Sequence, residues 1–89
     1  MTVVDPQPLI VFPCHYEFKA FGPGEAQFFE RVRGAVASVV PVSRQAMKSR
    51  PSRGGNYQCV SVLVTLQNRA QLDGIYAALR QIDDLKCLL

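Results

Sequence analysis

The amino-acid sequence predicts an α+β fold of ferredoxin-like type, a two-layer sandwich with the element order β-α-β-β-α-β. Residues 15–21 and 57–66 alternate between apolar and polar side chains, which is typical of half-buried strands. Residues 25–40 and 68–80 have the apolar periodicity of amphipathic helices. If each helix makes a right-handed crossover, both helices cover one face of an antiparallel sheet with the strand order 4-1-3-2.

The first strand and helix are delimited by turn-forming residues. Residues 15–21 place Tyr16, Phe18 and Ala20 on one face, and the sequence Gly22-Pro23-Gly24 then ends the strand. In the helix over 25–40, five apolar side chains recur at helical spacing, and Pro41 ends the helix. They are Phe28, Val32, Ala35, Val36 and Val39.

The second half of the chain again has a strand followed by a helix, and a hairpin turn joins that strand to the strand before it. Residues 43–50 predict a weaker strand, and residues 51–56 predict a turn by their proline, glycine and asparagine content. Residues 57–66 form the clearest strand. Asn68, with Gln71 three residues later, predicts a capping box for a helix that runs to Arg80. Residues 85–89 predict a last strand with Leu85, Cys87 and Leu89 facing the core.

Length and composition predict one domain. The chain has 89 residues, of which we expect 1–12 to be an extended N-terminal lead-in, because prolines there oppose a helix, and 13–89 to be a single domain. No basic residue precedes the apolar N-terminal residues, so we expect no signal peptide. The longest uncharged stretch, 34–43, is far shorter than the roughly 20 apolar residues that cross a bilayer. We therefore expect no membrane association.

Cysteine usage predicts a reducing compartment. The three cysteines, Cys14, Cys59 and Cys87, form no C-x-x-C pair, and their odd number opposes a disulfide framework. Free thiols predict a cytoplasmic protein.

With a single histidine, His15, the chain predicts no metal site and no cofactor. Cys14 and His15 do not predict a catalytic dyad, because adjacent strand residues point to opposite faces. We expect no catalysis.

Positive charge is concentrated in the middle of the chain. The net charge is +3, and no acidic residue lies between Arg31 and Arg69, a segment that holds seven basic residues. Such asymmetry is typical of a surface that binds anions or nucleic acid, and it is equally typical of a solvated basic face.

Several motifs resemble a known bacterial family. They are Leu9-x-x-Phe12-Pro13, Tyr16-x-Phe18-Lys19-x-Phe21-Gly22, and the turn Arg50-Pro51-Ser52-Arg53-Gly54-Gly55-Asn56-Tyr57 followed by Val60-Ser61-Val62. The chain resembles the YbeD-like family, a domain of unknown function. The resemblance implies a ferredoxin-like fold similar to small-molecule-sensing regulatory domains, and genes often encoded near the lipoate pathway. The Arg53-Gly54-Gly55 segment departs from the Lys-Gly pair of the family pattern.

The glycine-rich turn is the first candidate site. Consecutive glycine N–H groups can form an anion-binding nest, and arginine recognises phosphate or carboxylate. A hairpin turn needs such glycines for positive φ in any case, so a purely structural role remains open. The candidate residues for a ligand or partner are Lys48, Arg50, Arg53, Gly54, Gly55, Asn56 and Tyr57.

The open face of the sheet is the second candidate site. We expect Met47 on this face, together with a predicted interaction set of Lys19, Phe21, Ser61, Leu63 and Leu88. These surfaces favour a non-catalytic regulatory or protein-interaction module whose partner is another protein, a small acidic ligand or a second copy in a homodimer. The alternative is an RNA-binding domain that uses the basic Arg31–Arg69 segment. Nucleic acid is less favoured, because Cys59, Ser61 and Leu63 stand where stacking rings would be needed.

Overall fold

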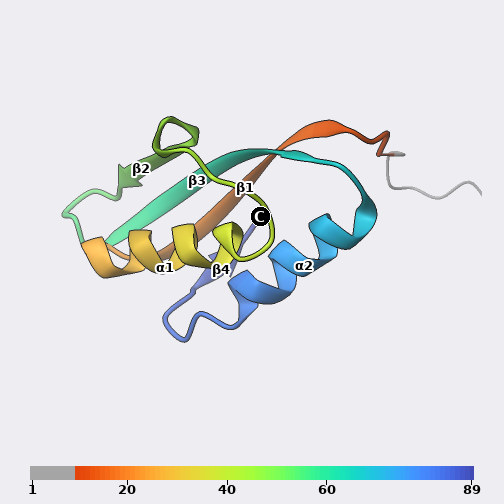
Figure 1. Ribbon diagram of the computed structural model, residues 1–89. Helices are drawn as coiled ribbons and strands as arrows, with labels where there is room; N and C mark the ends of the chain where they lie inside the picture. The colour runs from red at the N-terminus through yellow and green to blue at the C-terminus, as the bar shows by residue number, and fades with distance from the viewer. Residues whose placement is uncertain (1–9) are drawn as a thin grey trace, which may run out of the picture.

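The computed structural model describes residues 10–89 and confirms the ferredoxin-like element order (Figure 1). A short 3₁₀ turn, η1 (Arg44–Ala46), precedes the second strand. The strands and helices are β1 (Cys14–Pro23), α1 (Ala26–Ala37), β2 (Met47–Pro51), β3 (Tyr57–Leu66), α2 (Arg69–Arg80) and β4 (Cys87–Leu88).

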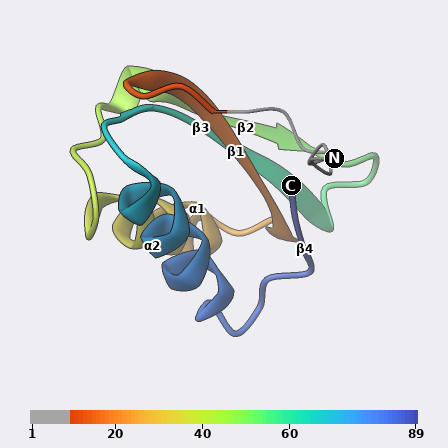
Figure 2. The same cartoon turned by 90° about the vertical axis from the view of Figure 1, so that its right-hand side faces the viewer.

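The four strands form one antiparallel sheet in the order β2-β3-β1-β4, which is the predicted order 4-1-3-2. The long central pair runs from Cys14 opposite Leu66 to Pro23 opposite Tyr57. Strand β2 is one edge and the two-residue β4 is the other. Both helices lie on the same side of this sheet, as the two views in Figures 1 and 2 show, so one face is covered and the other is open.

The hydrophobic core lies between the helices and the covered face. Alternation along β1 and β3 sends every second side chain into it, and the helices contribute the residues that recur at helical spacing. The largest fully buried side chains are Phe18, Phe28, Leu66, Ile75, Leu79, Val32, Val36, Val60 and Val62.

The predicted cap at the start of α2 is confirmed. The Asn68 side chain accepts a hydrogen bond from the Gln71 backbone N–H at 3.0 Å. Gln71 returns its side-chain oxygen to the N–H of Gln67, one residue before the cap, at 2.7 Å. Two N–H groups at the helix start are thereby satisfied.

The segment before β1 packs partly against the core through Ile10 and Phe12. Residues 1–9 of the predicted lead-in lie outside the described residues. The boundary between a lead-in at 1–12 and a domain at 13–89 therefore stays a prediction.

Met47 is on the opposite side of the sheet from the one predicted. It is buried and pairs with Val62, whose side chain faces the core. The sequence interpretation began the strand at residue 43, whereas 44–46 form the 3₁₀ turn and β2 begins at Met47. A four-residue difference leaves the alternation unchanged, so the face is set by strand pairing: directly opposite residues share a face, and Met47 lies opposite the inward-facing Val62.

The two faces of the last strand are likewise reversed relative to the prediction. Leu88 pairs with the buried Ala20 and packs against the core, so its predicted place on the open face is wrong. Cys87 pairs with Phe21 and is exposed, and Leu89 is 60% exposed, so neither faces the core as predicted. Leu85 does pack against the core, but from a turn in which its N–H bonds to Ile82. A one-residue offset in a strand moves every side chain to the other face.

Candidate interaction surface on the open sheet face

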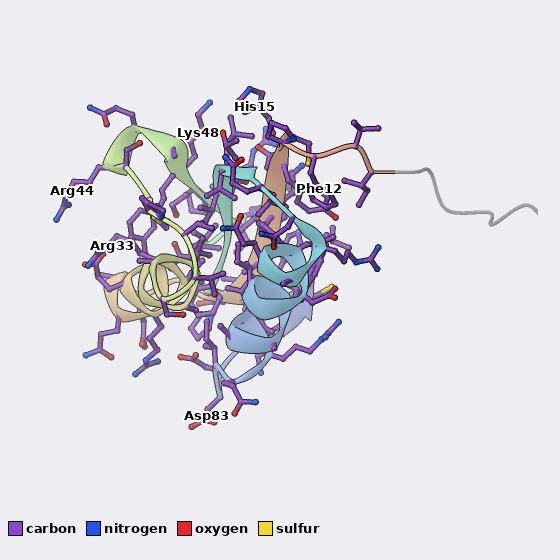
Figure 3. The ribbon with its side chains drawn as sticks, turned by 45° about the vertical axis from the view of Figure 1, so that its right-hand side comes forward. Phe12, His15, Arg33, Arg44, Lys48 and Asp83 are labelled. Atoms are coloured by element: carbon purple, nitrogen blue, oxygen red, sulfur yellow. The ribbon has the colours of Figure 1, made fainter. Side chains whose placement is uncertain are left out.

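The face of the sheet away from the helices carries polar and apolar side chains together. In Figure 3 the labelled side chains of His15 and Lys48 project from this side, away from α1 and α2. Leu63 and Tyr57 are exposed by 49% and 52%. Of the predicted interaction set, Lys19, Phe21, Ser61 and Leu63 take their places on this face by register, and only Leu88 does not.

A shallow hollow of about 570 Å³ lies at one end of the open face. Its lining is mostly apolar and comes from three strands and the turn before β4. The lining residues are Phe21, Tyr57, Lys86, Cys87 and Leu89. Phe21 lies between Cys59 of β3 and Cys87 of β4 in the register of the sheet. The sequence did not predict this site, because Cys87 and Leu89 were expected to face the core.

Cations lie on the open face from β2 to the lining of this hollow, which includes Lys86. Arg50 pairs in register with Cys59, and Lys48 pairs with Ser61, which in turn is opposite Lys19. Lys19 lies 3.8 Å from Glu17, an exposed contact. Exposed pairs of this kind are worth about 0–1 kcal/mol. The open face therefore has an excess of positive charge.

The basic segment predicted from the sequence divides into two groups. Arg31, Arg33 and Arg69 lie on the helices and pair with Asp84, Glu30 and Asp73. The other four are at the β2 edge and its turns, and within residues 10–89 none of them is at ion-pair distance from an acid. These are Arg44, Lys48, Arg50 and Arg53.

The glycine-rich turn is used structurally. Gly54 and Gly55 have φ of 88° and 76°, a backbone conformation that residues other than glycine rarely adopt. The Gly55 N–H donates to the Ser52 carbonyl at 2.9 Å, and the Tyr57 N–H donates to Ser52 Oγ at 3.1 Å. The first of these bonds occupies one of the N–H groups that an anion nest would use. Anion binding by this turn stays a prediction.

Gln58 is a structural residue that sequence reasoning missed. It is buried at 6% exposure, and its side-chain nitrogen donates to the carbonyls of Pro23 and Glu25 at 2.8 and 2.7 Å. Its oxygen accepts from Ser49 Oγ at 2.6 Å. Gln58 thus fastens β2 and the turn before α1 to β3, next to the candidate site. A polar residue at an inward position of an alternating strand was the available signal.

The covered side holds a second polar cluster at the sheet–helix boundary. The hydroxyls of Tyr16 and Tyr76 are 2.8 Å apart, and the Phe18 ring packs edge-on to Tyr76 at 5.0 Å between centroids. Burial, and after it the hydrogen bond to Tyr16, raises the pKa of Tyr76 to about 12. The Arg80 guanidinium lies 5.5 Å from the centre of the same ring.

Cys14 and His15 lie on opposite faces of β1, as predicted. Cys14 packs against the core, while the exposed His15 ring is 3.1 Å from Thr65 Oγ1. The part of the chain described here brings together no group of three His, Cys, Asp or Glu side chains that could hold a metal ion. Over the same residues, neither helix has the length and apolar character that crossing a membrane requires.

Comparison with known proteins identifies relatives along almost the whole chain. The model of the family "Protein of unknown function (DUF493)" matches residues 7–89. A UPF0250 protein of Neisseria gonorrhoeae is 35% identical over 82 residues, covering 91% of this chain and 90% of its own. A UPF0250 protein of Paraburkholderia phytofirmans is 38% identical over 72 residues, covering 80% of this chain and 81% of its own.

Solved structures share the fold at low sequence identity. The H. pylori protein HP0495 superimposes with a TM-score of 0.77 at 14% identity, covering 100% of this chain and 94% of its own. The ACT domain of a GTP pyrophosphokinase from Chlorobium tepidum does so with a TM-score of 0.66 at 8% identity, covering 84% and 94%. Both likenesses concern the fold alone.

Proposed function

We propose that this chain, which belongs to the DUF493 family of proteins of unknown function, is a non-catalytic regulatory or protein-interaction module that binds its partner on the open sheet face. The YbeD-like resemblance of the sequence is confirmed by its UPF0250 relatives. The ACT domain of the Chlorobium enzyme shows that this fold occurs as one part of a larger enzyme. This likeness motivates a regulatory role by analogy.

The observation that carries the proposal is the apolar exposure of the open face. Antiparallel sheets that face water on one side normally present polar side chains there. Here Tyr57, Leu63 and Leu89 are each about half exposed, and Lys48 and Arg50, which have no ion-pair partner among residues 10–89, lie on the same face. Apolar side chains grouped on a surface and bordered by polar ones are typical of an interaction site.

A photo-cross-linking experiment tests this proposal. Benzoylphenylalanine is placed at Leu63 or Lys48 on the open face and, as a matched control, at the exposed Ala77 of α2. The full-length protein is then irradiated in a lysate of its native bacterium. We expect discrete adducts from the two open-face positions and none from Ala77, with mass spectrometry identifying the partner.

Equal adducts from Ala77, or adducts from Ala77 alone, would contradict the proposal, because the partner would then bind the helical layer. The absence of adducts from both open-face positions would also contradict it.

RNA binding is a second candidate, favoured by the four cations of the β2 edge that pair with no acid within the described part of the chain, Arg44, Lys48, Arg50 and Arg53. Two rings, Phe21 and Tyr57, reach the open face, but the central positions of β3 hold Cys59, Ser61 and Leu63. Titration of labelled single-stranded RNA at low and physiological salt tests this candidate. Steeply salt-dependent binding would support it, and no binding at low salt would exclude it.

A further inference from the structure

We infer that the hollow lined by Phe21, Tyr57, Lys86, Cys87 and Leu89 receives an apolar side chain of a partner protein whose flanking residues are acidic. This inference rests on the proposed function and names the anchor point and the partner chemistry. It concerns a site at the end of the sheet where β4 pairs with β1, which shares only Tyr57 with the glycine-rich turn site predicted from the sequence.

The lining of the hollow suits an apolar anchor. The exposed parts of Tyr57 and Leu89, at 52% and 60%, stand beside the half-buried Phe21 ring. The backbone beneath is held by reciprocal hydrogen bonds between Lys19 and Leu89, at 3.1 and 2.8 Å, and by the Lys86 N–H to the Phe21 carbonyl at 2.7 Å. A hollow on a paired sheet needs little rearrangement to accept a side chain, and such preorganisation lowers the cost of binding.

Charge selects the partner. Lys86 is part of the lining, and Lys19 lies opposite Leu89 in the sheet. Arg50 lies on the same row of the sheet as Phe21, two strands away from it, with Cys59 between them. Glu17 lies on the same face, with its carboxylate 3.8 Å from the Lys19 ammonium group. A second copy of the chain meeting this face would set cations against cations, which opposes association, whereas acidic residues would be attracted.

The shape of the hollow favours a protein over a small molecule or RNA. Small-molecule pockets bury most of the ligand surface, and this hollow is open to solvent along the sheet face. Bases stacked along an RNA strand need successive rings, but Phe21 and Tyr57 lie at one corner of the sheet, with Cys59 between β2 and Phe21. A single anchor side chain in a shallow pocket is how protein interfaces concentrate binding energy.

NMR titration of the ¹⁵N-labelled full chain tests the inference with defined probes. The first peptide consists of Glu and Asp with one central Phe. The second replaces that Phe with Ser, and the third replaces the acids with Lys. Polyuridine RNA is the fourth probe. We expect the first peptide to shift the amides of Phe21, Tyr57, Cys87 and Leu89, and to bind about tenfold more tightly than the second. The third should leave these amides unshifted.

Substitutions give the matched comparison. Tyr57→Ala and Lys86→Glu should each weaken binding of the first peptide about tenfold, because one removes the wall of the hollow and the other reverses its charge. Arg80→Glu, which reverses a charge on α2 away from the sheet face, should leave the affinity unchanged. All three side chains are exposed, and the amide spectrum of each variant verifies its fold.

Equal affinity for the Phe and Ser peptides, shifts confined to other residues, or shifts at the hollow with RNA but not with the acidic peptide would overturn the inference. If cross-links from Leu63 or Lys48 still identify a partner in that case, the open face remains the interaction surface and only the anchor site is wrong. If the cross-links fail as well, the proposed function falls with it.

Discussion

The two faces of the sheet are built by the same strands, but one face stabilises the fold and the other is available for binding. On β3, Val60, Val62 and Leu66 point toward the helices and are fully buried, while Ser61 and Leu63 between them point the other way. The covered face holds the fold together, because its side chains leave water completely. The open face contributes little to stability, so its exposed apolar groups and cations are free to serve binding. Four comparisons of matched residues test this division.

The largest expected difference is between two leucines on β3. Leu66→Ala should destabilise the protein by about 2–5 kcal/mol, because it leaves a cavity in the core. Leu63→Ala, on the open face, should change stability by about 0.5 kcal/mol or less. Urea denaturation of the two variants measures both free energies of unfolding. Equal losses would mean that the open face is covered in solution.

Gln58 is a buried polar residue on the covered side, near the start of β3. Gln58→Leu should cost about 1–3 kcal/mol, because the carbonyls of Pro23 and Glu25 lose their donor in a buried setting. Gln45→Leu, at an exposed position of η1, should cost about 0.5 kcal/mol or less. Thermal unfolding of both variants gives the difference. A neutral Gln58→Leu would show that water replaces the amide.

Two glycines distinguish a required turn conformation from an ordinary helix position. Gly55→Ala should destabilise by about 1–2 kcal/mol, because Gly55 has a φ of 76°. Gly34→Ala in α1 should stabilise by about 0.5–1 kcal/mol, since a Cβ there meets no atom within 4 Å and alanine favours the helix. Chemical denaturation is the measurement, and stabilisation by both substitutions would refute the structural role of the turn.

The smallest effect concerns pH. The pKa of Tyr76 is raised from 10.0 to about 12 in the folded protein, so folding favours the protonated phenol. Its contribution to stability is complete below pH 10 and is lost as the pH rises toward 12. Tyr76→Phe should flatten the decline of unfolding free energy over this range, whereas the exposed Tyr57→Phe should leave it unchanged. Parallel declines in the Tyr76 variant and the unsubstituted protein would contradict this origin.

Sequence reasoning reached the fold because its signals are local. The alternation of Tyr16, Phe18 and Ala20 and the helical spacing of Phe28, Val32 and Val36 each lie within one element. Such periodicities identify the element type and the buried face together, and two helices with right-handed crossovers then leave one sheet order. The cap at Asn68 and the glycines of the hairpin turn were likewise readable, because each depends on a few neighbouring residues.

The candidate site was readable only in part. Lys19, Phe21, Ser61 and Leu63 lie on strands long enough for their alternation to be unambiguous, so they were placed on the correct face. Met47, Cys87, Leu88 and Leu89 lie in or beside short strands, where the alternation alone does not say which side chains face the core. In such strands too few residues remain to reveal the register.

The sequence by itself thus determined the order of the elements, the apolar core residues of the helices and the two long strands, and the face that those strands show to water. Only the tertiary structure decided which side chains of β4 face the core and that Phe21, Tyr57 and Leu89 meet in one hollow. The physical reason is that hydrogen bonding to β1, as between Lys86 and Phe21, sets the register of the last strand. A pairing between residues so far apart along the chain leaves no periodic signal within either segment.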